Sequence, residues 1–483
     1  MKIRLVLMAI LLSALAAGAQ GPDTLWTRTY GGGWTDIANS IGATPDHGYI
    51  VAGAHQLGSF PFPTLFYVAK LSESGDLHWS QTLGDAIHAE AGSIRATTDG
   101  GFIAVGYTVP LNGHTDILLV KLEANGDTVW TRTLASPDVE YPYCLQQTID
   151  GGYVIAGYTI PNSSSDNDLY LVKTSADGIP QWTRVIGGNG LDAALWVEQT
   201  PDGEYIASGY TSTNLNSSKF FLVKFTSSGD TLWSRHYGTD LNELAYSVKQ
   251  TLDGGYLLAG WSAIAETAPM RIYVVKTDEL GNQQWSRTYS AGVSDAAFAI
   301  NVLPSGEYII AGYSQSSDTS PEDMYLMKLS GTGDTLWTRK YGGQSTDVAL
   351  SLCRTVDGGY ALAGYTFSFG AGQADIYVVI TESDLAIREG DATERPTAHV
   401  LHANFPNPFN SSTQIEYTLP WAVDVTLTVF NLLGEEVVQL VDGEQVAGRQ
   451  SVVFDGSRFA SGLYLYRLEA GRFVETRKMV LLK

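Results

Sequence analysis

Short apolar runs separated by polar turn residues recur along the chain from residue 20 to residue 381. The clearest of them is a continuous apolar run that ends in glycine, as in "YLLAG" at 256–260, and it follows an Asp-Gly turn. Short runs after such turns are typical of β-hairpins, and no segment keeps a helical apolar period over about ten residues. The hydrophobic pattern therefore predicts an all-β chain.

Tryptophan sets the register of a long internal repeat. Seven tryptophans are spaced by 53, 51, 52, 51, 52 and 52 residues, starting at Trp26 and ending at Trp337. Each interval contains four strand candidates, which in the fifth copy are 245–251, 256–261, 272–276 and 284–289. Four antiparallel strands per repeat predict the blades of a seven-bladed β-propeller over 20–381. A β-solenoid is the alternative, although its repeats are usually shorter.

The first repeat element lies at an unusual place. "DTLWTRTYGG" at 23–32 returns almost unchanged as "DTLWTRKYGG" at 334–343, where it ends a repeat. The last copy has no such tryptophan strand after 376–380. We therefore predict that residues 25–30 pair with 376–380 and close the propeller, which leaves no incomplete blade edge.

After a polar linker at 382–400, the pattern changes. Residues 401–483 lack the tryptophan period and alternate apolar and polar positions over short segments, such as 413–419, 425–430 and 462–470, with turn signals between them. This pattern predicts a small Ig-like β-sandwich.

The tail carries four specific motifs: "NFPNPFN" at 404–410, "LLGEEV" at 432–437, "SGLYLYRL" at 461–468 and "KMVLLK" at 478–483. On these motifs the tail closely resembles the type A C-terminal sorting domain of the type IX secretion system. The resemblance implies recognition by the outer-membrane secretion machinery, then release or anchoring at the cell surface. An ordinary adhesion-type sandwich is the alternative. The residues that match the motifs are Asn404, Pro406, Asn407, Pro408, Phe409, Asn410, Gly434, Gly462, Tyr464 and Lys478. The repeats resemble secreted bacterial β-propeller repeats more loosely, with no defined activity implied.

The N-terminus and the charge indicate a location outside the cytoplasm. Residues 1–19 combine a basic start, an apolar run and small residues, which predicts a signal peptide cleaved between Ala19 and Gln20. A membrane anchor is disfavoured because the run is shorter than the ~20 residues of a span. The mature chain has 27 Lys and Arg against 51 Asp and Glu, a net charge of −24, which disfavours nucleic acid as a partner. We expect a secreted or surface-bound monomer with two separate thiols, Cys144 and Cys353.

Two features of the repeats are candidates for binding. An acidic residue follows each tryptophan by ten or eleven positions, and a ring of such carboxylates would suit calcium. Because the feature recurs in every copy, the alternative that each carboxylate holds its own turn is favoured. The candidates are Asp36, Glu90, Glu140, Asp192, Glu243, Asp295 and Asp347. The loops between second and third strands vary and include Phe60, Phe62, Phe367 and Phe369, which suits a glycan or protein ligand.

Catalytic motifs are absent from the sequence. The arginines two residues after the tryptophans belong to the repeat, and no nucleophile elbow, P-loop or zinc-protease motif occurs. We assign no catalytic residue and no cofactor. The sequence favours a non-enzymatic binding or adhesion protein, with a polysaccharide-acting hydrolase or lyase as the alternative. An enzyme would place two or three carboxylates together in one or two blades.

Overall fold

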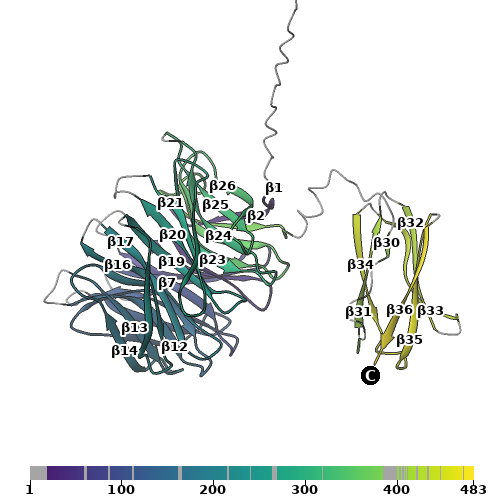
Figure 1. The fold of residues 1–483 in the computed structure, drawn as a ribbon, viewed down its shortest axis with the longest axis horizontal. Helices are drawn as coiled ribbons and strands as arrows, with labels where there is room; N and C mark the ends of the chain where they lie inside the picture. Colours follow the sequence, from purple (N-terminus) through teal and green to yellow (C-terminus); the bar gives the residue numbers. More distant parts are fainter. Residues whose placement is uncertain are drawn as a thin grey trace, which may run out of the picture. The chain divides into compact units, whose positions relative to one another are not determined.

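The chain divides into two compact units, Met1–Ile387 and Arg388–Lys483, which we name the repeat region and the C-terminal domain. The computed structural model describes 19–58, 63–84, 88–110, 114–161, 166–214, 217–239, 241–263, 269–317 and 319–384, then 400–401, 404, 407, 409–410, 412–419, 423–431, 434–445, 448–471 and 473–482. Every regular element in these residues is a strand, as expected for an all-β chain (Figure 1). No helix in these ranges is long and apolar enough to cross a membrane.

Strands β2 to β29 pair antiparallel into successive four-stranded units. The first strands are β3 (Asp36–Ala43), β7 (His88–Ala96), β11 (Val139–Gln147), β15 (Asp192–Gln199), β19 (Asn242–Gln250), β23 (Ser294–Val302) and β27 (Asp347–Arg354). The second strands are β4 (Tyr49–Gln56), β8 (Phe102–Val109), β12 (Tyr153–Ile160), β16 (Tyr205–Asn214), β20 (Tyr256–Ala263), β24 (Tyr308–Gln315) and β28 (Tyr360–Thr366). The third strands are β5 (Thr64–Leu71), β9 (Asp116–Leu122), β13 (Asp168–Thr174), β17 (Ser217–Phe225), β21 (Arg271–Thr277), β25 (Glu322–Leu329) and β29 (Asp375–Thr381). The fourth strands are β6 (Leu77–Leu83), β10 (Thr128–Leu134), β14 (Pro180–Ile186), β18 (Thr231–Tyr237), β22 (Gln283–Tyr289), β26 (Thr335–Tyr341) and the N-terminal β2 (Thr24–Tyr30).

The hydrophobic core of the repeat region lies between neighbouring units. One cluster joins Ile50 and Phe66 of the first unit to Ile94 and Phe102 of the second, and similar clusters follow at later junctions. Second and third strands are apolar on both faces because a unit packs on each side of them, whereas fourth strands are largely exposed. This explains why the second strand appears in the sequence as an unbroken apolar run.

The tryptophan that sets the repeat packs its indole on a turn glycine of the next unit. A Cβ on Gly281, whose φ is +76°, would lie 2.8 Å from Cζ3 of Trp233. Only glycine therefore satisfies both the left-handed backbone and the indole contact. At the last junction the N-terminal segment supplies this glycine, because a Cβ on Gly21 would lie 2.6 Å from Cε3 of Trp337.

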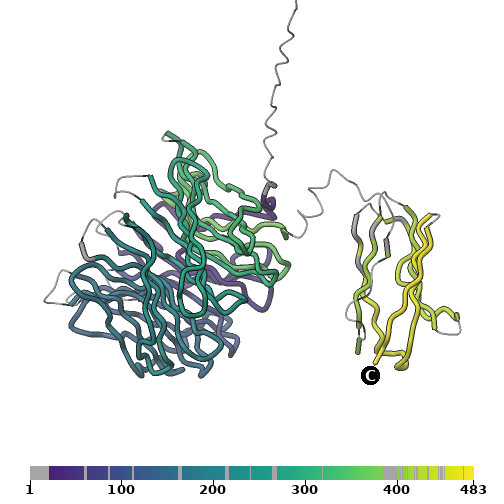
Figure 2. Tube along the Cα trace, viewed as in Figure 1, coloured from purple at the N-terminus to yellow at the C-terminus, as the bar shows by residue number. Residues whose placement is uncertain are grey.

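The N-terminal strand completes the last unit as predicted. β2 pairs antiparallel with β29, with Trp26 opposite Ile380 and Tyr30 opposite Ile376. In Figure 2 the purple start of the chain accordingly lies beside green segments from the end of the repeat region. A short strand that the sequence analysis missed, β1 (Ala19–Gln20), also pairs in parallel with β26. The signal-peptide prediction concerns residues 1–18, which lie outside the described residues, and their junction with β1.

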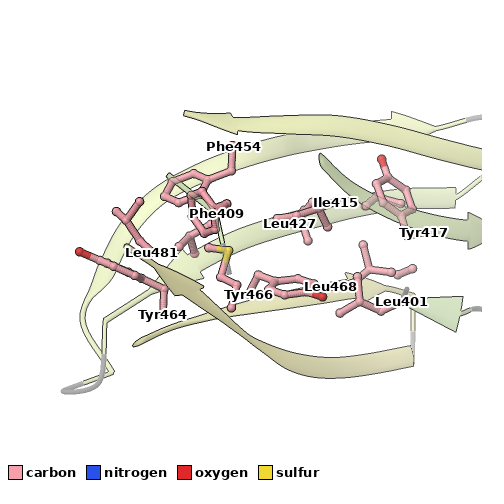
Figure 3. Packing of buried hydrophobic residues seen from close by; sticks show 14 of the residues in the cluster. Leu401, Phe409, Ile415, Tyr417, Leu427, Phe454, Tyr464, Tyr466, Leu468 and Leu481 are labelled. Carbon is pink, nitrogen blue, oxygen red and sulfur yellow. The ribbon is translucent and has the colours of Figure 1, made fainter. Parts of the chain in front are cut away.

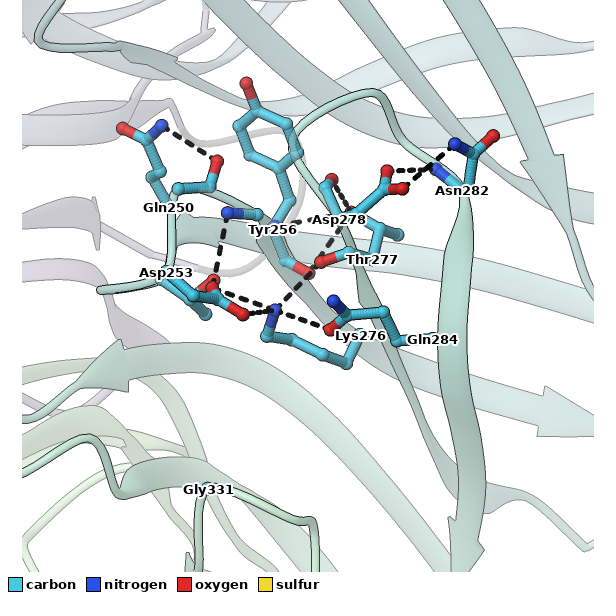
Figure 4. Close-up of polar contacts among 12 residues, drawn as sticks. Gln250, Asp253, Tyr256, Lys276, Thr277, Asp278, Asn282, Gln284 and Gly331 are labelled. Carbon is cyan, nitrogen blue, oxygen red and sulfur yellow. Dashed lines mark hydrogen bonds and ion pairs between the residues drawn. The ribbon is translucent and has the colours of Figure 1, made fainter.

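A buried lysine on the third strand ties each of the first five units to the Asp-Gly turn that precedes its second strand. In the fifth unit, Lys276 Nζ lies 2.8 Å from Asp253 Oδ2 and 2.8 Å from the Thr277 carbonyl oxygen (Figure 4). A buried ammonium is stable only with such partners. In the sixth unit, Asp384 supplies a carboxylate to Lys328 from beyond β29, 2.5 Å away.

These pairs make part of the stability depend on acid pH. Although partial burial alone would raise the pKa of Asp99, hydrogen bonds from Thr97 and Lys121 lower it to about 2. A carboxyl whose pKa is lowered on folding stabilises the fold above its ordinary pKa, and this contribution is lost as the pH falls toward 2. We expect Asp99→Asn to lower the melting temperature at pH 6 more than at pH 2.5. Thermal melts at both pH values check this, and an equal loss at both would contradict it.

The C-terminal domain consists of two sheets around one core. The first contains β30 (Val400–Leu401), β31 (Ser412–Leu419) and β34 (Gly448–Asp455), and the second contains β32 (Val423–Phe430), β33 (Glu436–Gln445), β35 (Gly462–Ala470) and β36 (Phe473–Leu481). Ile415 and Phe454 from one sheet meet Leu427 and Tyr466 from the other (Figure 3). The period-two alternation in the sequence thus places one face of each sheet in the core.

Candidate functional site

Each first strand of the repeat region contains a β-bulge. The cause is the glycine in its partner strand: Gly260 lies opposite Ala245, and a Cβ there would lie 1.8 Å from the Leu244 carbonyl oxygen. After this close approach the first strand has one unpaired residue, as expected for a bulge. The bulged residues are Asn39, Gly92, Tyr143, Leu195, Tyr246, Phe298 and Leu350.

All of the bulged residues line one cavity of about 610 Å³, to which every first strand contributes. Its volume and its aromatic lining are those of a small-molecule site. The bulged position holds a different kind of side chain from unit to unit, although the surrounding repeat is regular. The walls of the cavity are therefore asymmetric.

Four tyrosines form one wall. The Tyr107 and Tyr141 ring centroids are 5.0 Å apart, the Tyr141 and Tyr158 centroids 5.1 Å, and the Tyr143 and Tyr158 centroids 5.9 Å. Tyr143 is 44% exposed and lines the cavity, so its ring is accessible from the lumen. Burial raises the pKa of Tyr143 and that of Tyr158, the latter to about 12, so both phenols stay protonated and can donate hydrogen bonds.

A second aromatic pair comes from the fifth and sixth units. The Tyr246 and Phe298 rings meet edge to face, with centroids 4.8 Å apart and an interplanar angle of 88°. This geometry is favourable for aromatic rings and fixes both side chains at the cavity wall.

The charged groups lie on β7 and near Trp196. Glu90 accepts hydrogen bonds from Asn39 Nδ2 at 2.7 Å and from the Tyr107 hydroxyl at 3.0 Å. The Arg95 guanidinium lies over the Trp196 ring, with its central carbon 5.4 Å from the centroid. The cavity thus combines aromatic faces with one carboxylate and one guanidinium among its lining residues.

Of the predicted acidic ring, the structure brings only Glu90 to the cavity wall. Its strand is offset by one position, since Ala89 occupies the place that the other acids hold, and alternation therefore turns Glu90 toward the lumen. The other acids each accept a hydrogen bond from the turn four residues earlier, as Asp347 does from the Gly343 amide at 2.8 Å. These acids are Asp36, Glu140, Asp192, Glu243, Asp295 and Asp347.

Burial also changes the charge of some turn acids. It raises the pKa of Glu140 to about 7 and raises that of Glu243. Among the described residues, one group of three side chains has its ligand atoms close enough for a metal ion: His47, Glu73 and Asp357. All three are exposed and none belongs to the predicted ring.

The variable loops are described only in part. Phe367 and Phe369 are 52% and 43% exposed, whereas Phe60 and Phe62 lie outside the described residues. The two cysteines form no disulfide, in agreement with the prediction of separate thiols.

The sorting motifs lie at the C-terminal strand of the C-terminal domain. Asn407 Oδ1 accepts a hydrogen bond from the Val480 amide at 2.9 Å, and Asn404 Nδ2 donates to Thr413 Oγ1 at 2.9 Å. Buried Phe409 forms a parallel bridge with Leu481. Gly434 has a φ of +78° in a turn, whereas Gly462 and Tyr464 lie in β35 and exposed Lys478 in β36. Asn410 is described as exposed, but Pro406 and Pro408 fall outside the described residues.

Sequence analysis missed the cavity residues, although a signal for them was present. The glycine that ends each second strand is buried within a sheet, where glycine often indicates a bulge in the paired strand. Seven bulges at one level of a repeat would have identified the bulged positions as a set.

Comparison with known families confirms the resemblance of the tail. Residues 403–482 match the secretion system C-terminal sorting domain. Such a domain marks proteins that the type IX machinery exports and attaches to the cell surface or releases, so the predicted localisation is confirmed. Among curated proteins, none matches this chain.

Solved structures with a similar fold include three of low identity. PorZ, a surface component of the type IX secretion system of Porphyromonas gingivalis, has a TM-score of 0.41 and 12% identity over 94% of this chain and 60% of PorZ. A fungal alcohol oxidase of the AA5 family has a TM-score of 0.47 and 12% identity over 96% and 100%. A Dyadobacter fermentans protein of unknown function has a TM-score of 0.43 and 13% identity over 75% and 99%. None of these likenesses assigns an activity to the chain.

Proposed function

We propose that this chain, whose residues 403–482 are a secretion system C-terminal sorting domain, is a binding protein of the cell surface or the surrounding medium. Its binding module is a seven-bladed β-propeller over 20–381, closed by the N-terminal strand. A linker at 382–400 leads to an Ig-like sandwich at 401–483 that carries the export signal.

Contacts between the units support the propeller. Each first strand packs on the first strand of the next unit, and β27 of the last packs on β3 of the first. The Asp36 amide donates to the Ala374 carbonyl at 2.7 Å across this last junction, as the Asp192 amide does to the Asn167 carbonyl at an internal one. A closed ring of blades has these equivalent junctions.

The observation that carries the proposed binding function is the asymmetric ring of bulged residues around the cavity. A purely structural axis would repeat one side chain in every blade. Here the bulges present aromatic faces in three blades and smaller groups in the others. Sugar rings have apolar C–H faces and many hydroxyls, which complement tyrosine rings and phenol groups. We therefore propose a saccharide ligand bound in the cavity.

Binding is favoured over hydrolysis. Most glycosidases need two carboxylates on either side of the scissile bond. Among the lining residues the structure describes, Glu90 is the one carboxylate, and both of its oxygens already accept hydrogen bonds.

The test is saccharide binding by cavity variants of the mature chain. We expect Tyr143→Ala to weaken binding of a glycan-array hit about tenfold, because it removes an accessible aromatic face. Phe367→Ala, which removes an exposed ring from a variable loop, is the matched control and should bind normally. Titration calorimetry measures both. Loss of binding in the loop variant alone would place the ligand on the loops, and cleavage of the glycan would contradict the non-enzymatic function.

A further inference from the structure

Near Trp196 the cavity presents hydrogen-bond donors that have no acceptor. The Trp196 indole Nε1 and the Ser93 hydroxyl oxygen are buried and form no hydrogen bond within the described residues, and both residues line the cavity. An indole N–H can only donate. Buried polar groups are normally paired, so these two indicate a ligand acceptor.

Arg95 adds a charged donor beside them. Its Nη1 donates to Ser40 Oγ at 3.0 Å and to the Ile94 carbonyl at 2.7 Å. Within the part of the chain that the structure describes, its Nε and Nη2 form no hydrogen bond. Half of the planar fork that guanidinium offers to a carboxylate thus remains available.

The positive charge of Arg95 is not neutralised locally. Lys249 Nζ lies 5.0 Å from the centroid of the Trp196 ring and is paired with Glu198 at 2.9 Å. No described carboxylate forms an ion pair with Arg95. Glu90 lies five residues earlier on β7, on the order of 15 Å along the strand. The Arg95 end of the cavity is therefore locally positive in a chain whose net charge is −22.

We propose that this end of the cavity binds the carboxylate of an acidic saccharide, a uronate, while the tyrosine wall contacts sugar rings. The proposal rests on the proposed saccharide binding and names its class. Arg95 supplies the charge and a hydrogen-bonding edge, and Trp196 Nε1 and the Ser93 hydroxyl donate to remaining acceptors. Glu90 repels a second carboxylate at the far end, which orients the ligand along the axis.

The test compares two probes that differ only in charge: tri-galacturonic acid and its full methyl ester. The mature chain is titrated with each by calorimetry. We expect the acid to bind at least about tenfold more tightly than the ester, because only the acid can form a charge-assisted pair with Arg95. In Arg95→Met the two affinities should agree within about twofold, with ester binding retained.

Arg132→Met is the matched control. Arg132 also lies over a tryptophan, Trp130, at 5.4 Å, but on the outer strand β10. This variant should keep the preference for the acid. Trp196→Phe removes one donor without changing charge and should weaken acid binding more than ester binding. It also keeps the proposal testable if Arg95→Met does not give a cooperative thermal melt.

The outcomes separate this inference from the proposed function. Equal binding of acid and ester by the wild-type chain would overturn the uronate proposal and leave saccharide binding in place. Retention of the acid preference in a folded Arg95→Met chain would also overturn it. Binding of neither probe, together with no hit on a glycan array, would overturn both.

Discussion

We expect the mature chain that lacks residues 20–33 to melt at least about 10 °C below the intact mature chain. The deletion removes β2 and leaves β29 without its antiparallel partner. Each ladder hydrogen bond contributes about 1 kcal/mol net, and burial of a large side chain about 2 kcal/mol. The lost ladder and the lost contacts of Trp26 and Tyr30 with the last core cluster therefore cost at least about 5 kcal/mol.

The junction loses more than one strand. Without Gly21, Trp337 lacks its turn contact, and the Tyr341 hydroxyl loses its 2.8 Å hydrogen bond to the Pro22 carbonyl oxygen. The matched control is Leu25→Ser in the intact chain, since Leu25 is 61% exposed and should not affect melting. A synthetic peptide of residues 20–33 added to the truncated chain should raise its melting temperature. A truncated chain that melts within about 2 °C of the intact one would show that the ring does not depend on this closure.

The second large effect concerns export. A chain truncated after residue 400 should accumulate in the periplasm, because it lacks the sorting domain that matches at 403–482. Cell fractionation and immunoblotting of medium, surface and periplasm measure this. The matched control is full-length Val474→Ser, which changes an exposed side chain of β36 and should be exported normally.

A finer variant tests how the motif acts. Asn407→Ala removes the side chain that accepts the hydrogen bond of the Val480 amide and so loosens the end of β36. We expect reduced export at normal stability of the repeat region, since the two compact units are separate. Normal surface levels of the truncated chain would refute the sorting role.

The predictability of the fold differed from that of the site. The strand pattern, the tryptophan period and the pairing of 25–30 with 376–380 could be inferred from the sequence, because hairpin turns and apolar runs are local signals. The acidic position was recognised as a repeat. The offset of Glu90 was not interpreted, although Trp79 precedes it by eleven residues and not ten. In a strand, that single position reverses the side chain, and it brought Glu90 to the cavity.

By itself, the sequence determined the all-β class, the repeating unit, its completion by the first strand and the export signal, because each depends on short-range periodicity or on a contiguous motif. Only the tertiary structure decided what surrounds the axis. The bulged residues are about fifty positions apart in the chain, and the close approach of each strand glycine turns them toward one lumen. Likewise, Asp384 reaches Lys328 only because the chain end folds back on the sixth unit. Such contacts arise from the packing of distant strands, which no local pattern specifies.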